Sequence, residues 1–167
     1  MSLENFQLPI RLIPELYKNS LIQLEEKQTS DNNLKVENLS YLGAYKKNIL
    51  VLVEDEAAVY LSDNYLEFLI QILNACKLNL QDVAIVNRYQ KVGVSMQQVF
   101  ENLSPNLVLA FGLINQGDYA LFKHMPNYQA QMEGDFTLIS ADTLSVIAQT
   151  PEKKKQLWLA LKQYFNL

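Results

Sequence analysis

Four short apolar runs, separated by segments with helical periodicity, constrain the fold of this 167-residue chain more than any other feature. Runs that are rich in β-branched residues and lack polar alternation are typical of strands buried on both faces of a sheet. We expect strands at residues 48–53, 82–87, 106–112 and 136–140. Because helical segments lie between these runs, the strands are expected to be parallel and joined by helical crossovers.

Segments with apolar residues at helical spacing fill the intervals and the C-terminal end of the chain. We expect helices at residues 63–77, 95–103, 143–149 and 151–165. Asp63 is expected to cap the first of them, and Pro151 suits a first helical position because its missing N–H costs nothing there. The inner face of the first helix is expected to consist of Leu66, Leu69, Ile70 and Leu73. The pattern predicts a three-layer α/β/α domain with a four-stranded parallel sheet.

The remaining N-terminal part is expected to belong to the same single domain, which covers residues 1–167. Residues 8–26 have the pattern of an amphipathic helix, residues 28–37 resemble a polar connector, and residues 48–165 form the α/β core. The length, and an apolar content of 49%, suit one hydrophobic core. The N-terminal helix has two interpretations: it binds a partner, or it packs on the chain's own sheet.

Composition excludes several classes of partner and site. Charged residues make up 19% of the chain and the net charge is −4, which argues against broad electrostatic attraction to nucleic acid. No apolar run approaches the roughly 20 residues of a membrane span, and the N-terminus lacks the pattern of a secretory signal. A single cysteine allows neither a disulfide nor a thiolate metal site within the chain. We therefore expect a cytoplasmic protein without a membrane partner and without direct nucleic-acid binding.

Three stretches in a fixed order carry a resemblance to a known family. Residues 66–87 form a helix-strand unit, and residues 104–112 read S-P-N-L-V-L-A-F-G. Pro151, Lys154 and Trp158 then stand at the spacing P-x-x-K-x-x-x-W. Together these stretches resemble bacterial members of the uracil-DNA glycosylase superfamily, over about residues 48–165. The resemblance implies the fold of that superfamily.

The last stretch, residues 142–158, also resembles the psi subunit of bacterial DNA polymerase III. Members of that family typically end in P-S-L-x-x-L-x-x-x-P-x-x-K-x-x-x-W. They have the glycosylase-like fold without glycosylase activity, and they work by contacting other proteins. This resemblance implies a protein-interaction subunit, with replication clamp-loader proteins as partners.

The glycosylase motifs are altered at both places where the enzymes' chemistry resides. The family's G-E-A-P-G turn after the first strand corresponds here to residues 53–58, V-E-D-E-A-A, with three carboxylates and no glycine. The family's H-P-S corresponds to Ala141, Asp142 and Thr143, and alanine cannot donate a hydrogen bond to a departing uracil. The family's iron–sulfur cluster needs four cysteines, and this chain has only Cys76. We expect no catalysis, no cofactor and no metal.

Asp55 and Asn87 are the residues that would carry catalysis if the chain were an enzyme. By the resemblance, Asp55 aligns with the acidic position that serves the attacking water, and Asn87 with the strand-end Asn that reads the base edge. The alternative interpretations are a solvated, non-catalytic turn for Asp55 and hydrogen bonding to local backbone for Asn87. An active glycosylase, or a nucleobase- or nucleotide-binding domain that uses the strand-end cleft, therefore stays open as an alternative function.

Other polar residues have structural interpretations. We expect His124, the only histidine, at the surface, and Cys76 in inert apolar packing. Lys153, Lys154 and Lys155 form either a solvated helix face or a nucleic-acid contact. We expect Glu54, Asp55, Glu56 and Asp142 at one edge of the sheet, because both loops follow carboxyl ends of parallel strands. Carboxylates at this edge would repel DNA.

Overall fold

The computed structural model describes residues 39–89, 94–113 and 126–167. All of them belong to one compact unit that spans residues 35–167. The expected helix at 8–26 and connector at 28–37 lie outside the described residues. These two elements, and the assignment of the whole chain to a single domain, stay predictions.

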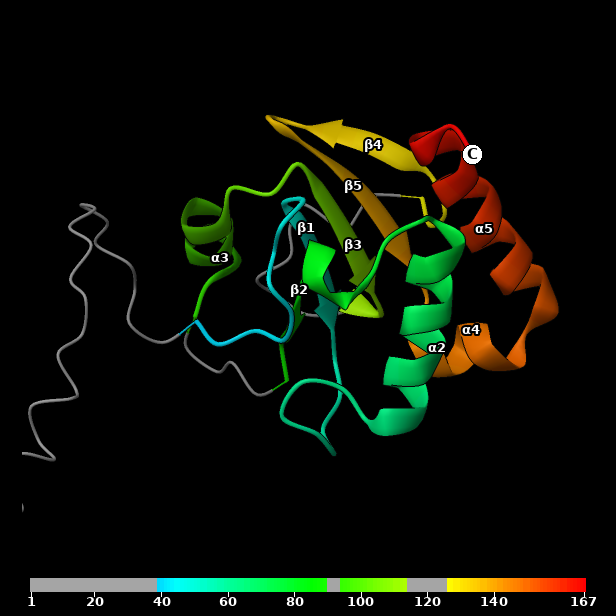
Figure 1. Cartoon of the computed structure of the whole chain (residues 1–167), viewed down its shortest axis with the longest axis horizontal. Helices are drawn as coiled ribbons and strands as arrows, with labels where there is room; N and C mark the ends of the chain where they lie inside the picture. The colour runs from blue at the N-terminus through cyan, green and yellow to red at the C-terminus, as the bar shows by residue number, and fades with distance from the viewer. Residues whose placement is uncertain (1–38, 90–93, 114–125) are drawn as a thin grey trace, which may run out of the picture. The chain divides into compact units, whose positions relative to one another are not determined.

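A five-stranded sheet forms the centre of the described part of the chain (Figure 1). Its strands are β1 (Ile49–Val53), β2 (Val83–Asn87), β3 (Leu107–Phe111), β4 (Ala130–Glu133) and β5 (Phe136–Ala141). Their order across the sheet is β2-β1-β3-β5-β4. β1, β2, β3 and β5 are parallel and match the four expected strands to within one residue at each end. The α/β class with a mostly parallel sheet is therefore confirmed.

The expected number of strands is wrong, because β4 adds an antiparallel edge strand to β5. Its sequence, A-Q-M-E, has no apolar run, and its side chains alternate between exposed and half-buried. An edge strand needs only one bonded neighbour and little apolar surface, so it lacks the signal that marks buried strands. The turn to β5 uses Gly134 at a φ of +57°, a conformation that glycine adopts without strain.

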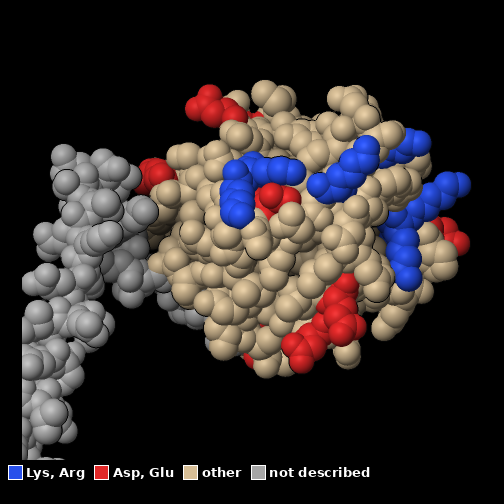
Figure 2. Space-filling model, viewed as in Figure 1, with Lys and Arg blue, Asp and Glu red and all other residues tan. Residues whose placement is uncertain are grey.

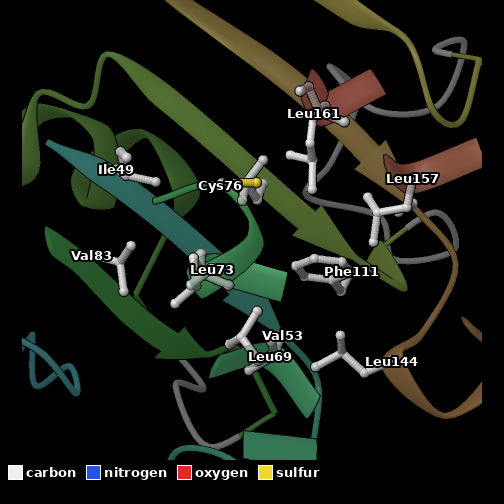
Figure 3. Close-up of a cluster of buried hydrophobic side chains, with 14 of the residues drawn as sticks. Ile49, Val53, Leu69, Leu73, Cys76, Val83, Phe111, Leu144, Leu157 and Leu161 are labelled. Atoms are coloured by element: carbon white, nitrogen blue, oxygen red, sulfur yellow. The ribbon is translucent and has the colours of Figure 1, made fainter. Parts of the chain in front are cut away.

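Helices contribute to two hydrophobic clusters, one on each face of the sheet. The helices are α2 (Asp63–Ala75), α3 (Met96–Leu103), α4 (Leu144–Gln149) and α5 (Pro151–Phe165). Because side chains alternate along a strand, Val51 and Val53 of β1 pack with residues of α2, α4 and α5. Leu50 and Leu52 point the other way and pack with residues of α3. Figure 3 shows the first cluster, with Leu73 and Leu157 directed toward the strands.

The start of α2 differs from the prediction. Its N-cap residue is Ser62 rather than Asp63, and the Ser62 hydroxyl makes no capping bond because it donates to the Asp55 carboxylate. The inner face also differs, since Leu69 and Leu73 are buried as expected while Ile70 is half-buried and outside the cluster. Ile72 packs against the cluster instead, so the inner stripe is rotated relative to the expected one.

The outer edge of β2 is covered by the segment that precedes β1. Leu42 exchanges backbone hydrogen bonds with Ile85, at 3.0 and 2.8 Å, and the Tyr45 N–H donates to the Val83 carbonyl at 3.1 Å. Between them Gly43 has a φ of +115°, and an added Cβ would lie 2.1 Å from the Val83 carbonyl oxygen. Only glycine allows this close approach, which leaves no unpaired edge on β2 at this position.

We predict that Gly43→Ala lowers the free energy of unfolding by about 3 kcal/mol or more, because it combines a disfavoured φ with a backbone clash. Gly134→Ala is the matched control: its φ is also positive, but nothing lies within 4 Å of the added Cβ. The control is expected to cost about 1 kcal/mol. Urea denaturation measures both, and equal losses would show that the contact between Gly43 and β2 contributes little.

Candidate functional site

A pocket of about 330 Å³ lies at the carboxyl ends of the parallel strands. Three carboxylates and three aromatic rings line it: Glu54, Asp55, Glu56, Tyr65, Tyr89 and Phe111. β1 lies between β2 and β3, and the helices that precede those two strands, α2 and α3, belong to clusters on opposite faces of the sheet. Open α/β sheets bind their ligands at such a switch point, outside the carboxyl ends of the strands. This pocket is therefore the candidate functional site.

Asn87 ends β2 and is completely buried. Its Oδ1 accepts hydrogen bonds from the backbone N–H groups of Asp55 and Tyr89, both at 3.1 Å. Its Nδ2 donates to the carbonyls of Asp55 and Ala58, at 2.6 and 2.8 Å. These four bonds use the full capacity of an amide side chain. Asn87 thus fixes the loop after β1 to the end of β2, and it does not line the pocket.

Asp55 lines the pocket, but its carboxylate is committed to its own loop. Oδ1 accepts from the Ala57 N–H at 2.9 Å, and Oδ2 accepts from both the N–H and the hydroxyl of Ser62. Burial alone would raise the pKa of Asp55, yet the hydrogen bonds from Ser62 and the backbone lower it below its ordinary value. A general base works best with a pKa near the operating pH, so this environment moves Asp55 away from that role.

The three consecutive carboxylates differ in their exposure to solvent. Glu56 is exposed, whereas Glu54 and Asp55 are half-buried. Burial raises the pKa of the Glu54 carboxyl, and the positive charge of Arg88 opposes that shift. The pocket wall therefore carries negative charge that is partly removed from water.

Asp142 follows β5, as expected, but it is not one of the residues that line the pocket. Its carboxylate accepts a hydrogen bond from the Tyr128 hydroxyl and forms an ion pair with Lys153 at 2.8 Å. Burial raises its pKa, but Lys153 and Tyr128 outweigh that effect and lower it. The expected negative charge of Asp142 is countered by Lys153, which is a half-buried ion-pair partner rather than part of a solvated face.

Cys76 and His124 are the remaining candidates from the sequence analysis. Cys76 follows α2 and is 5% exposed, and burial raises the pKa of its thiol to about 11, which fits the predicted inert packing. His124 lies outside the described residues. Within the described ranges, no group of three or more His, Cys, Asp or Glu side chains is placed to hold a metal ion.

The aromatic lining of the pocket was not predicted as a site. Tyr65 lies in the first turns of α2, Tyr89 follows β2, and Phe111 ends β3, so the three rings are far apart in sequence. Thr143 and Ser145, at the start of α4, also contribute. Their positions in the sequence could have indicated this site, because Tyr89 and Phe111 stand at or just after the carboxyl ends of expected strands, where ligand-binding loops lie.

Neither a scan against models of known protein families nor a search of curated proteins finds a match to this chain. Among the helices of the described residues, none has the length and apolar character needed to span a bilayer.

We predict that Asn87→Ala lowers the free energy of unfolding by about 3 kcal/mol, because it leaves two backbone N–H groups and two carbonyls without their partner. Asn74→Ala, on the exposed side of α2, serves as the control and should change stability by no more than about 0.5 kcal/mol. Chemical denaturation measures both variants. A loss at Asn87 as small as at Asn74 would mean that the loop does not depend on this amide.

Proposed function

We propose that this chain is a non-catalytic protein-interaction domain with a three-layer, uracil-DNA glycosylase-like fold, comparable with the psi accessory subunit of bacterial clamp loaders. One observation carries the non-catalytic part: the side chains of Asp55 and Asn87 are occupied by hydrogen bonds within the chain. The hydrogen bonds of both side chains hold the loop after β1 in place. Asp55 lines the pocket, and Asn87 does not.

Base excision needs three functional groups, and at the positions that correspond to the family's catalytic residues we find none of them free. Reading a base edge needs an amide with unused donors and acceptors, and Asn87 has none left. Activating a water needs a carboxylate whose pKa is near the operating pH, and the pKa of Asp55 is lowered. By the resemblance, the histidine that stabilises the leaving base corresponds to Ala141 at the end of β5, whose side chain has no donor, and the next residue, Asp142, is paired with Lys153. These positions therefore do not support the known glycosylase mechanism.

The accessory-subunit part of the proposal is supported by the C-terminal stretch. Residues 142–158, which resemble the psi family, form the Thr143 cap, α4 and the first half of α5. Pro151 is the first residue of α5, and the Thr143 hydroxyl accepts from the Val146 N–H at 3.4 Å. The proline and the threonine thus mark the starts of two helices, the arrangement that the resemblance implies for this stretch.

The purified full-length chain is expected to release no uracil from single-stranded or duplex DNA and to co-purify with clamp-loader subunits of its host. Both outcomes follow from a site without free catalytic groups on a domain that contacts proteins. A gel-based base-release assay and tagged co-purification measure them, with an active glycosylase and an unrelated tagged protein as controls. Base release that Asp55→Ala abolishes would overturn the non-catalytic assignment. Recovery of no replication protein would overturn the clamp-loader assignment.

A nucleobase-binding function is the second candidate, because the strand-end pocket is open and aromatic. Its volume of about 330 Å³ falls at the lower end of the ~300–1,000 Å³ range of small-molecule sites. Tyr65 and Tyr89 offer ring surfaces for stacking, whereas Phe111 is 2% exposed and belongs to the pocket floor. Glu54 and Asp55 on the same wall would repel phosphate, so this alternative favours an uncharged base or a nucleoside over a nucleotide.

Thermal-shift measurements test this alternative. If it holds, free nucleobases or nucleosides raise the melting temperature, because a ligand that binds only the native state stabilises it. The corresponding nucleoside monophosphates should give a smaller shift, because their charge meets Glu54 and Asp55. Tyr89→Ala, a change at a side chain that is 51% exposed, should remove the shift without unfolding the protein. Equal melting temperatures with and without all of these compounds would eliminate the alternative.

A further inference from the structure

An apolar groove runs between α2 and α5, away from the strand-end pocket. Phe68, Ile72 and Ala75 line it from α2, and Leu157, Trp158 and Leu161 line it from α5. Together with the polar lining residues Gln71 of α2 and Lys154 of α5, these positions follow the i, i+3, i+4, i+7 spacing of a single helical face on each helix. The groove is therefore a continuous trough between two helical ridges, and buried Ile147 of α4 also lines it.

The groove combines a buried floor with exposed apolar walls. Leu157 and Leu161 are almost completely buried, whereas Trp158 is 38% exposed and Ala75 is exposed. Its volume of about 190 Å³ lies below the ~300–1,000 Å³ of small-molecule sites. That space suits one or two apolar side chains of a partner rather than a whole ligand. Grooves of this kind receive the apolar face of an amphipathic helix, with anchors at i, i+3, i+4 and i+7.

Lysines dominate the α5 side of the groove. α5 has four lysines and one acidic residue, Glu152, although the whole chain has a net charge of −4. Figure 2 shows Lys and Arg side chains gathered on the α5 side of the face in view. Lys153 is already paired with Asp142, but Lys154, Lys155 and Lys162 have no ion-pair partner among the described residues. Lys154 lies in the first turn of α5, where the helix dipole disfavours a positive charge.

Lys154 brings positive charge directly into the lining of the groove. It is one of the lining residues, and its Nζ lies 5.5 Å from the centroid of the Phe68 ring on the opposite wall. Lys155 and Lys162 stand seven residues apart on α5, with Trp158 between them, so all three belong to one stripe of the helix. A ligand that places an apolar side chain beside Trp158 would therefore bring its neighbouring side chains close to these lysines.

We propose that the α2–α5 groove docks an acidic amphipathic helix of a partner protein, with its apolar side chains against Trp158 and its carboxylates against Lys154, Lys155 and Lys162. This deepens the proposed protein-interaction function and rests on it. The positive charge of α5 favours an acidic helix over a second copy of the chain as the ligand of this groove. In a two-fold contact the same surface faces itself, so the lysines of one α5 would lie against those of the other.

Trp158 makes the proposal directly measurable, because it is the only tryptophan in the chain. The probes are three synthetic helical peptides of about 18 residues, roughly five turns, without tryptophan. They share one leucine stripe and differ only in having Glu, Gln or Lys at the flanking positions. The Glu peptide should shift Trp158 emission to shorter wavelength and saturate at micromolar concentration. The Gln peptide should bind about tenfold more weakly, and the Lys peptide should leave the emission unchanged.

Two pairs of substitutions at exposed positions keep the test specific to the groove. Ala75→Glu places a charged side chain in the groove, whereas Asn74→Glu adds the same charge at the neighbouring position, which does not line it. Lys154→Glu removes the lining lysine, whereas Lys46→Glu makes the same charge change on the segment that covers β2. Ala75→Glu and Lys154→Glu should each weaken the Glu peptide at least about tenfold, and each control should stay within about twofold.

Several results would overturn the docking proposal. They are an unchanged Trp158 emission with the Glu peptide, equal binding of the three peptides, or equal losses in Ala75→Glu and Asn74→Glu. A dimer in sedimentation that Ala75→Glu disperses would assign the groove to a second copy instead. Base release by the same preparation reports on the proposed function alone. Unchanged Trp158 emission without base release would overturn only the docking proposal. Base release would overturn the non-catalytic function, whatever the result with the peptides.

Discussion

Burial of β1 on both of its faces is the constraint on which the rest of the structure depends. All five side chains of Ile49–Val53 are at most 4% exposed, and each fully buried Leu, Ile or Val stabilises the fold by about 1.5–3 kcal/mol. β1 can be buried in this way only if β2 and β3 flank it and helices cover both of its faces. The strand-end pocket lies at the carboxyl end of this strand, where Val53 and the loop that follows it line the pocket.

The hydrogen bonds that order the strand-end loop occupy the two side chains that the sequence offers for catalysis, Asp55 and Asn87. Asn87 is a fully buried polar residue, and its position is tolerable only because backbone groups satisfy all of its bonds. Asp55 likewise stabilises the loop through Ala57 and Ser62. In an enzyme such groups keep part of their bonding capacity for substrate, as general acid–base catalysis requires. Here all four hydrogen bonds of Asn87 and three hydrogen bonds to the Asp55 carboxylate are made within the fold. The remaining lining of the pocket includes aromatic rings, the residues Thr143 and Ser145, and the carboxylates of Glu54 and Glu56.

The elements that burial specifies could be predicted from the sequence, and those that depend on distant partners could not. The four parallel strands and the start of α5 at Pro151 follow from apolar runs and from the conformational limits of proline. β4 was not predicted, because an edge strand buries little apolar surface and its sequence therefore contains no apolar run. Asp142 was predicted at the correct edge, but its pairing with Lys153 could not be predicted, because the two residues come together only when α5 folds back beside the end of β5. The rings of the pocket wall come from three separate elements, and no local pattern joins them.

Cys76 gives the molecule a chemical property of practical value. Its thiol is 5% exposed, and burial raises its pKa to about 11, so at neutral pH almost none of it is the nucleophilic thiolate. The chain has no other cysteine. The native protein is therefore a ready background for selective labelling: a cysteine introduced at an exposed position would react with maleimides while Cys76 stays unmodified. Dyes or spin labels can then be attached at single sites, without first removing a side chain that packs against the sheet.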